Sequence, residues 1–255
     1  MDLRLDKRRA LGYKSPSQIA RRVTEGWAED NLYCAACSSR ALEAQAANTR
    51  AVDFRCSSCN AAYQLKSLKT WSERRIPDAG YEAMMHAIRS GCVPNLLVMQ
   101  YSLDWFVQNL LLVPSFFFTP ASIQKRKPLG PKARRAGWVG CNILLDKIAD
   151  EGKIRVVVDG QPVAAAGVRK RYDEVRPLAS IAVSTRGWTL DVLRIVRDIG
   201  KPGFSLGEVY MREGVLATAY PNNKNIRPKI RQQLQVLRDL GYIRFEGRGR
   251  YSLLR

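Results

Sequence analysis

The sequence predicts a mixed α/β domain followed by a small domain of three helices and a β-hairpin. Three observations lead to this fold class. Two Cys-x-x-Cys pairs lie in the first quarter of the chain, apolar runs of strand length follow a helical segment, and the last third contains short amphipathic helices before a Gly-rich hairpin. We place the domain boundary between residues 1–182 and residues 183–255.

Local patterns define the elements of the N-terminal part. Pro16 suits the first position of a helix, and Ser15 with Gln18 is a candidate capping box. Two short strands around a cysteine pair, then a helix and two apolar strands, are expected at residues 51–67, 79–90, 96–101 and 109–114. This order favours an α/β or α+β layer.

The C-terminal part has a stronger local pattern, which begins after a connecting segment at residues 176–188. Ser205 and Glu208 form a capping box at the start of the second of three helices. Helices are expected at residues 189–199, 205–210 and 228–239, and strands at residues 242–245 and 251–254. Three helices and a β-hairpin form the winged helix-turn-helix, which predicts DNA binding.

Charge also favours a polyanionic partner. The 255 residues include 42 Lys and Arg against 23 Asp and Glu, a formal net charge of +19, and residues 184–255 carry 14 basic and 6 acidic side chains. The sequence contains no basic amphipathic helix with an aromatic face, no run of 18 apolar residues and no apolar signal segment. We therefore expect a cytoplasmic protein with a nucleic-acid partner and no membrane partner.

The cysteine pairs predict a zinc site. Cys34, Cys37, Cys56 and Cys59 form two Cys-x-x-Cys pairs with 18 residues between them, a spacing typical of a tetrahedral zinc knuckle. Four thiolates leave no open position for water, so the expected Zn²⁺ is structural. A redox-active pair is the alternative, and two matched pairs argue against it.

Asp53, Gln64 and Lys66 are candidates for a nuclease centre. Hydrolysis of a phosphodiester needs a metal, an anionic ligand for that metal and a cation near the attacking water. On a strand, Gln64 and Lys66 point to one face and Leu65 to the other, toward the core. The alternative is that Asp53 is a turn residue and Lys66 a surface charge. With a single histidine in the chain, histidine-based catalysis is disfavoured.

A basic segment at residues 124–142 is a candidate phosphate contact. It has no acidic residue, and its prolines and glycines exclude a regular helix, so we expect a mobile loop along a phosphate backbone. Its basic residues are Lys125, Arg126, Lys127, Lys132, Arg134 and Arg135. Trp138 follows these basic residues within the segment. It suits stacking on a base or wedging between bases, and the alternative is an ordinary core aromatic.

The last expected helix carries side chains suited to the edges of guanine and adenine. They recur along the face opposite much of the apolar stripe, namely Arg227, Arg231, Gln235 and Arg238. Arg248 and Arg250 lie at the hairpin tip, where a wing meets phosphates. A solvated polar face is the alternative.

Three strings, KPLGPKARRAGWVGCNI, STRGW and IRQQLQVLRDLGYIRFEGRGRY, together with the order of the cysteine pairs around VDF, resemble the DpnI-type methyladenine-dependent type II restriction endonucleases of bacteria. The resemblance covers both domains. It implies a PD-(D/E)XK nuclease core with a four-cysteine zinc-binding insert, a winged helix-turn-helix domain, and Mg²⁺-dependent cleavage of double-stranded DNA that carries N6-methyladenine in GATC.

The same resemblance implies roles for single residues. Asp53 and Lys66 stand where the family has its metal-binding acid and catalytic lysine, and the Leu65 carbonyl is a further expected Mg²⁺ ligand. Gln64 departs from the family, which has glutamate there, and its uncharged amide implies weaker metal binding. Glu25, on the expected N-terminal helix, is either an auxiliary metal ligand or a surface charge.

We therefore expect a restriction endonuclease that is monomeric in solution. Trp188, Tyr210 and Tyr220 are candidates for contacting the methyl group in the second domain, and the sequence does not choose among them. Two competing classes are a non-cleaving methyl-DNA reader or transcription regulator, and an RNA-polymerase-like zinc-ribbon subunit that ignores methylation.

Overall fold

The structure is a computed structural model that describes residues 1–46, 51–70, 72 and 74–254. Its residues group into two compact units. The first unit comprises Met1–Glu73, Val93–Ser115 and Glu151–Arg176, and the second comprises Arg74–Cys92, Phe116–Asp150 and Pro177–Arg255. The boundary expected at residues 182/183 stays a prediction, since the second unit takes residues from both sides of it. Among the described residues, no helix is both long and apolar enough to span a bilayer.

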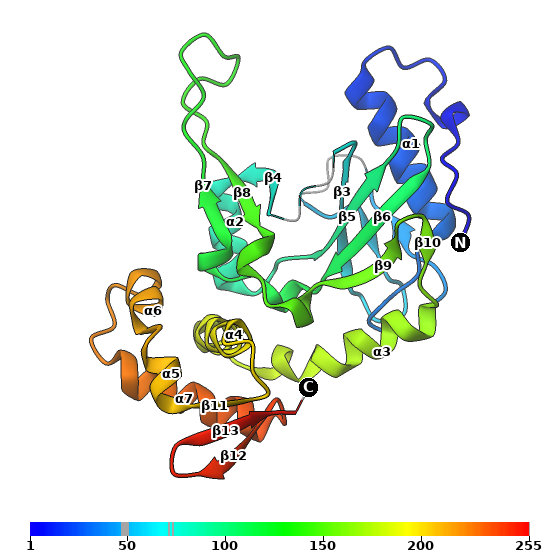
Figure 1. The fold of residues 1–255 in the computed structure, drawn as a ribbon. Helices are drawn as coiled ribbons and strands as arrows, with labels where there is room; N and C mark the ends of the chain where they lie inside the picture. The colour runs from blue at the N-terminus through cyan, green and yellow to red at the C-terminus, as the bar shows by residue number, and fades with distance from the viewer. Residues whose placement is uncertain (47–50, 71, 73, 255) are drawn as a thin grey trace. The chain divides into compact units, whose positions relative to one another are not determined.

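Within the described residues, the first unit is built on a seven-stranded sheet of order β1-β2-β3-β5-β6-β9-β10 (Figure 1). Its strands are β1 (Glu43–Ala44), β2 (Phe54–Arg55), β3 (Ala62–Leu68), β5 (Asn95–Tyr101), β6 (Val107–Val113), β9 (Ile154–Val158) and β10 (Gln161–Pro162). β3 and β5 pair in parallel, and the other neighbours pair antiparallel. β5 is almost wholly buried because its run of apolar residues suits a central strand covered on both faces.

Two helices of the first unit pack on this sheet, α1 (Pro16–Asn31) against β3 and α3 (Ala165–Val175) against β9. Proline stands at the start of α1, as expected. The expected capping box is wrong: in the part of the chain that the structure describes, the Ser15 hydroxyl lies 2.9 Å from the Ser17 hydroxyl and caps no backbone N–H group. Thr24 donates to Ala20 and lies 3.1 Å from Ser67 of β3, which fixes α1 beside that strand.

The second unit contains a three-stranded sheet of order β4-β8-β7 and the helix α2 (Tyr81–Ser90). Its strands are β4 (Arg75–Gly80), β7 (Ile123–Lys125) and β8 (Gly140–Leu144). Short 3₁₀ helices occur in both units, at Lys7–Ala10, Ser115–Phe117, Pro120–Ser122, Leu145–Lys147, Asp150–Gly152 and Arg176–Ser180. α2 packs on α4 (Val183–Asp198), the first helix of the C-terminal part, so these segments share one unit.

The C-terminal part has the helices and the hairpin expected of a winged helix (Figure 1). Its elements are α4 (Val183–Asp198), β11 (Gly203–Ser205), α5 (Leu206–Tyr210), α6 (Glu213–Ala219), α7 (Ile226–Asp239), β12 (Ile243–Gly247) and β13 (Arg250–Leu253). The capping box of Ser205 and Glu208 is confirmed. The apolar stripe of α7 is buried, as Ile230, Leu234 and Leu237 are each 0% exposed.

Two expectations for this part are wrong. Residues 183–188 belong to α4 instead of a connecting segment, because Trp188 is buried and stacks on Tyr220 with ring centroids 4.0 Å apart. The expected number of three helices is also wrong, because the described part of this region has a fourth helix, α6, of whose residues only Leu216 is buried. A helix with so short an apolar stripe leaves little periodic signal.

Candidate functional site

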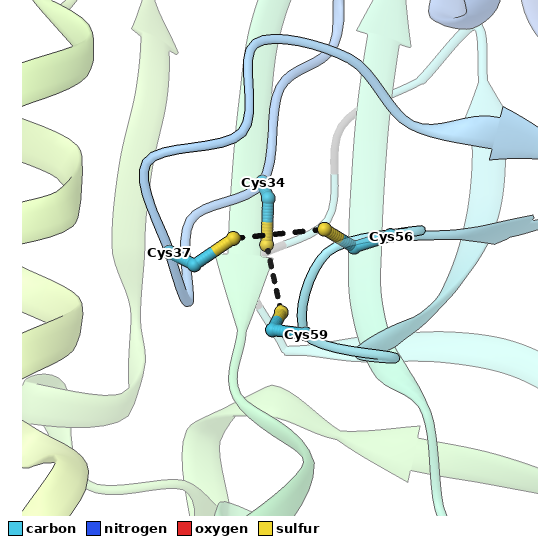
Figure 2. A group of neighbouring side chains, drawn as sticks. All are labelled: Cys34, Cys37, Cys56 and Cys59. Atoms are coloured by element: carbon cyan, nitrogen blue, oxygen red, sulfur yellow. Dashed lines mark hydrogen bonds between the residues drawn. The ribbon is translucent and has the colours of Figure 1, made fainter.

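The four cysteines converge into one cluster in the first unit (Figure 2). Their sulfur atoms all lie within 4.8 Å of one another, with 3.5 Å between Cys34 and Cys59 and 3.6 Å between Cys37 and Cys56. In a zinc tetrahedron with Zn–S bonds of about 2.3 Å, the sulfurs are about 3.8 Å apart. The cluster therefore fits one Zn²⁺, as the cysteine spacing predicts.

Neighbouring elements hold the cluster in place. Cys56 and Cys59 belong to the turn between β2 and β3, and Cys34 and Cys37 to the segment after α1. The Tyr63 hydroxyl lies 3.2 Å from the Cys34 sulfur and accepts the Ala35 N–H. From α3, Arg169 donates to the carbonyls of Cys34 and Ser39 at 3.0 and 2.7 Å. Sequence reasoning did not find Arg169, because no local signal links it to residues more than a hundred positions away.

The thiols of the cluster differ in acidity. Burial raises the pKa of Cys34 to about 12, although the hydrogen bond from Tyr63 opposes it. Burial also acts to raise the pKa of Cys56, but the backbone N–H groups of Cys59 and Ser58 outweigh it and bring that pKa to about 6. A cation bound to all four sulfurs favours their thiolate forms, so the cluster is suited to a soft metal.

A pocket of about 560 Å³ in the same unit brings together the three candidate nuclease residues. Asp53, Gln64 and Lys66 all line it, as does Leu65 between the last two. The expected position of Leu65 in the core is only partly observed, because the residue is half-buried. Gln64 is 8% exposed, so its amide is held inside the pocket wall.

The pairing of β2 with β3 positions Asp53. β2 pairs with Ala62 and Tyr63 of β3. Asp53 directly precedes β2, so it lies beside β3 just past the end of this pairing. The Asp53 carboxylate accepts the Leu65 N–H at 2.7 Å, and the Asp53 N–H donates to the Tyr63 carbonyl at 2.9 Å. Because the N–H and C=O of a strand residue point to the same edge, the Leu65 carbonyl faces this edge too. Tyr63 thus contacts both the cysteine cluster and Asp53.

The helix α1 supplies charged groups to the same pocket. Arg21 and Glu25 both line it, and the Arg21 Nε donates to the Glu25 carboxylate at 2.7 Å. This hydrogen bond is the largest cause that raises the pKa of Arg21, and the charge of Asp53 adds to it. The spacing of four residues is readable as a helix ion pair. Only the structure places that pair beside Asp53.

The basic segment forms an extended hairpin between β7 and β8 of the second unit (Figure 1). Its two arms are joined by backbone hydrogen bonds from Arg126 to Gly140 and from Leu129 to Trp138, both 2.9 Å. The six basic side chains predicted to contact phosphates are all exposed, namely Lys125, Arg126, Lys127, Lys132, Arg134 and Arg135. Their roles stay predictions. As expected, the segment between β7 and β8 forms no regular helix, and its mobility stays a prediction.

Trp138 lies at the base of this hairpin and is half-buried. The Arg135 guanidinium lies over its ring, 4.9 Å from the centroid. Side-chain atoms of Trp138 come so close to Gly80 and Gly140 that a Cβ at Gly140 would lie 2.9 Å from the ring. Gly80 and Gly140 therefore leave the room that the indole ring occupies.

The exposed face of α7 carries the predicted base-reading side chains, although three of the four have partners, and Arg238 pairs with Asp239 at 2.9 Å. Arg227 pairs with Glu213 at 2.7 Å and lies over the Tyr210 ring, and Arg231 donates to the Tyr210 hydroxyl at 2.9 Å. Gln235 and Arg238 are exposed. The wing turn holds Arg248 at a φ of 48° between two glycines, with Arg250 exposed beside it.

The aromatic candidates of the second unit fall into two places. Trp188 and Tyr220 stack beside a pocket of about 600 Å³ that also includes residues 221–225, whereas Tyr210 lies against the arginines of α7. The Tyr220 hydroxyl donates to Asp191 at 2.7 Å. Burial raises the pKa of Asp191, which is 3% exposed. Sequence reasoning missed Asp191, since it lies within the apolar stretch of α4.

Family comparisons match both parts of the chain. The family model described as DpnI, the Dam-replacing family, matches residues 1–181, and the model described as the Dam-replacing HTH domain matches residues 184–253. The helix-turn-helix match supports DNA as the partner, and the first family implies a restriction endonuclease, a hydrolase that acts on DNA. The resemblance noted from sequence motifs is confirmed. The chain belongs to the DpnI family, and it carries the helix-turn-helix domain of that family at its C-terminal end.

Proposed function

We propose that the protein is a Mg²⁺-dependent endonuclease with a PD-(D/E)XK core that cleaves double-stranded DNA at G-m6A-TC sites. One observation carries the catalytic part of this proposal: Asp53, Gln64 and Lys66 line a single pocket. They do so within the part of the chain that matches the nuclease family. DNA supplies the phosphodiester substrate, and the excess of basic residues favours its binding.

The pocket offers oxygen ligands of the kind that Mg²⁺ prefers. Asp53, the Gln64 side-chain carbonyl and the Leu65 backbone carbonyl would hold the ion, which polarises the scissile phosphate. One Asp53 oxygen already accepts the Leu65 N–H, which fixes the orientation of the carboxylate. Lys66 orients the attacking water and stabilises the negative charge that develops on the phosphate.

The cysteine cluster has a different role in this proposal. Its four sulfurs would complete the ligand set of a tetrahedral Zn²⁺, so the zinc would stabilise the fold and take no part in hydrolysis. Since Tyr63 touches Cys34 and bonds to Asp53, the zinc site supports the strand pair that carries the nuclease residues.

The second unit would read the DNA. The exposed arginines and lysines of the hairpin bind phosphates, and Trp138 contacts the modified base or its neighbouring step. Burying one added methyl group against an aromatic ring contributes about 1 kcal/mol, enough for a severalfold preference. α7 and the wing contact a second copy or another face of the site through Arg231, Gln235, Arg238, Arg248 and Arg250.

Digestion of plasmid DNA tests this function. The protein is incubated with Mg²⁺ and the same plasmid from a host that methylates adenine in GATC and from one that does not. We expect fragments only from the methylated plasmid, and intact DNA with the Lys66→Ala variant. Equal cutting of both plasmids would contradict the methylation dependence.

A second candidate function is a reader that binds methylated DNA without cutting it. Gln64 favours this alternative, because it lacks the charge of the glutamate expected at that position and weakens the affinity for Mg²⁺. In the plasmid experiment, the reader retards methylated DNA in a gel and leaves it intact at all Mg²⁺ concentrations. Restored cutting by Gln64→Glu would identify this residue as the cause.

A further inference from the structure

The pocket around Asp53 contains a cation of its own. Arg21 donates to Glu25 at 2.7 Å and lines the same pocket as Asp53. The Glu25 side chain is only 21% exposed, so its charge acts inside the pocket.

Glu25 supplies a second negative charge, which the three candidate nuclease residues lack. Gln64 is neutral, so among Asp53, Gln64 and Lys66 the aspartate alone is anionic. A third carboxylate in the lining, Glu29, is one turn further along α1 and pairs with Arg9 at 3.2 Å. Among the described lining residues, Glu25 is therefore the carboxylate whose charged partner, Arg21, also lines the pocket.

This proposal rests on the proposed function: we propose that Arg21 is an internal counter-ion that competes with the divalent cation for Glu25, in the pocket that also contains Asp53. The metal binds as Glu25 leaves Arg21, and Glu25 then supplies the negative charge that Gln64 lacks. Arg21 is a positioning residue, since it acts through Glu25. The competition raises the metal concentration that the site requires and keeps the pocket neutralised before the metal binds.

Binding of Mn²⁺ to the zinc-loaded protein tests the proposal without DNA or cleavage, with free Mn²⁺ measured by electron paramagnetic resonance. We expect Arg21→Gln to bind Mn²⁺ about ten-fold more tightly and Glu25→Gln about ten-fold more weakly, changes equivalent to about 1.4 kcal/mol each. The double variant should bind no more tightly than Glu25→Gln alone, because Arg21 acts through Glu25.

Two matched variants control for general charge effects. Arg22 and Glu29 line the same pocket on the same helix, and Arg22 lies over the Tyr13 ring. Arg22→Gln and Glu29→Gln remove the same charges and should change the Mn²⁺ affinity by less than about three-fold, as is usual for solvent-screened charges. Arg21 is 54% exposed, so its substitution should preserve the fold, which circular dichroism and zinc content verify.

The outcomes separate this proposal from the proposed function. Equal tightening by Arg21→Gln and Arg22→Gln, or unchanged affinity in Glu25→Gln, overturns the counter-ion role. If Asp53→Asn weakens Mn²⁺ binding while Glu25→Gln does not, the nuclease centre stands and only the counter-ion role is wrong. If Asp53→Asn has no effect either, the metal centre of the proposed function is wrong as well.

Discussion

The first unit contains two candidate metal sites built in opposite ways. The cysteine cluster gathers four sulfurs of one kind from two tight pairs, and its ligand set is complete. The pocket around Asp53 gathers different groups from α1, from the segment before β2 and from β3, and it has the uncharged Gln64 where the family resemblance implies glutamate. The cluster is specified by local spacing, whereas the pocket exists only after the chain has folded.

We therefore expect the two sites to tolerate different kinds of substitution. A structural metal site needs all its ligands, because the metal contributes directly to folding stability. A hydrolytic site can lose one charge and still bind substrate, because its binding surface and its chemistry depend on separate groups. Changes at the cluster should therefore affect stability, and changes at the pocket should affect rates and metal requirements.

The largest expected effect comes from breaking the cysteine cluster. Cys34 is fully buried and contacts Tyr63, so Cys34→Ser should abolish zinc binding and lower the stability of the first unit by several kcal/mol, as structural zinc sites contribute about 10 kcal/mol. Zinc content by mass spectrometry and thermal unfolding measure this effect. The exposed Cys92 offers the control Cys92→Ser, and equal melting temperatures of the two variants would contradict a structural zinc.

The next effect should appear in the rate alone. Lys66→Ala should reduce cleavage by roughly 10²–10³-fold, the usual cost of removing a group that stabilises developing negative charge, while zinc content and DNA binding persist. Lys69→Ala is the control, because Lys69 is exposed just beyond the end of β3. Single-turnover cleavage and gel retardation are compared for both variants. A parallel loss of DNA affinity in Lys66→Ala would mean that the lysine only binds phosphate.

A smaller effect, on the Mg²⁺ requirement, is expected when a second carboxylate is added to the pocket at position 64. Gln64→Glu adds the missing carboxylate and should lower the Mg²⁺ concentration for half-maximal cleavage by about ten-fold. Gln45→Glu adds the same charge elsewhere in the pocket lining and should change that concentration much less. Plasmid cleavage at a series of Mg²⁺ concentrations measures this requirement for both variants. An identical shift in both variants would show that the position of the charge does not matter.

The smallest effect is expected at the basic hairpin, a site formed by one local segment. Trp138→Ala should reduce the preference for methylated over unmethylated DNA by about five-fold, which corresponds to losing about 1 kcal/mol of methyl burial. Leu129→Ala changes the residue whose backbone pairs with Trp138 and serves as the control. Affinities for the two DNA forms come from fluorescence anisotropy. Equal weakening toward both forms would assign Trp138 to general binding.

The sequence predicts best those features that depend on neighbours in the chain. The cysteine pairs, the Ser205 and Glu208 cap and the buried stripe of α7 are local patterns, and the structure has all three. The resemblance to the DpnI family came from short motifs and is confirmed over both parts of the chain. The roles of Asp53, Gln64 and Lys66 remain predictions, although the structure brings them into one pocket.

Features that depend on distant segments escaped prediction. The stacking of Trp188 on Tyr220 joins α4 to the end of α6, and it explains why α4 begins earlier than its apolar stripe indicates. The pairing of Arg21 with Glu25 is a local signal, but its position beside Asp53 depends on how α1 packs on β3. Such contacts have no periodicity that a single sequence can reveal.

The interleaved path of the chain limits how the protein can be dissected. α2 and the segment around Thr119 pack with α4, and a Cβ at Gly187 of α4 would lie 3.8 Å from Thr119. A fragment that stops at residue 182 would lose α4 and leave this apolar surface bare to water. Protein engineers who wish to join the part that matches the DpnI family model to another DNA-binding module should therefore keep α4 with it, or redesign the face of α2 that α4 covers.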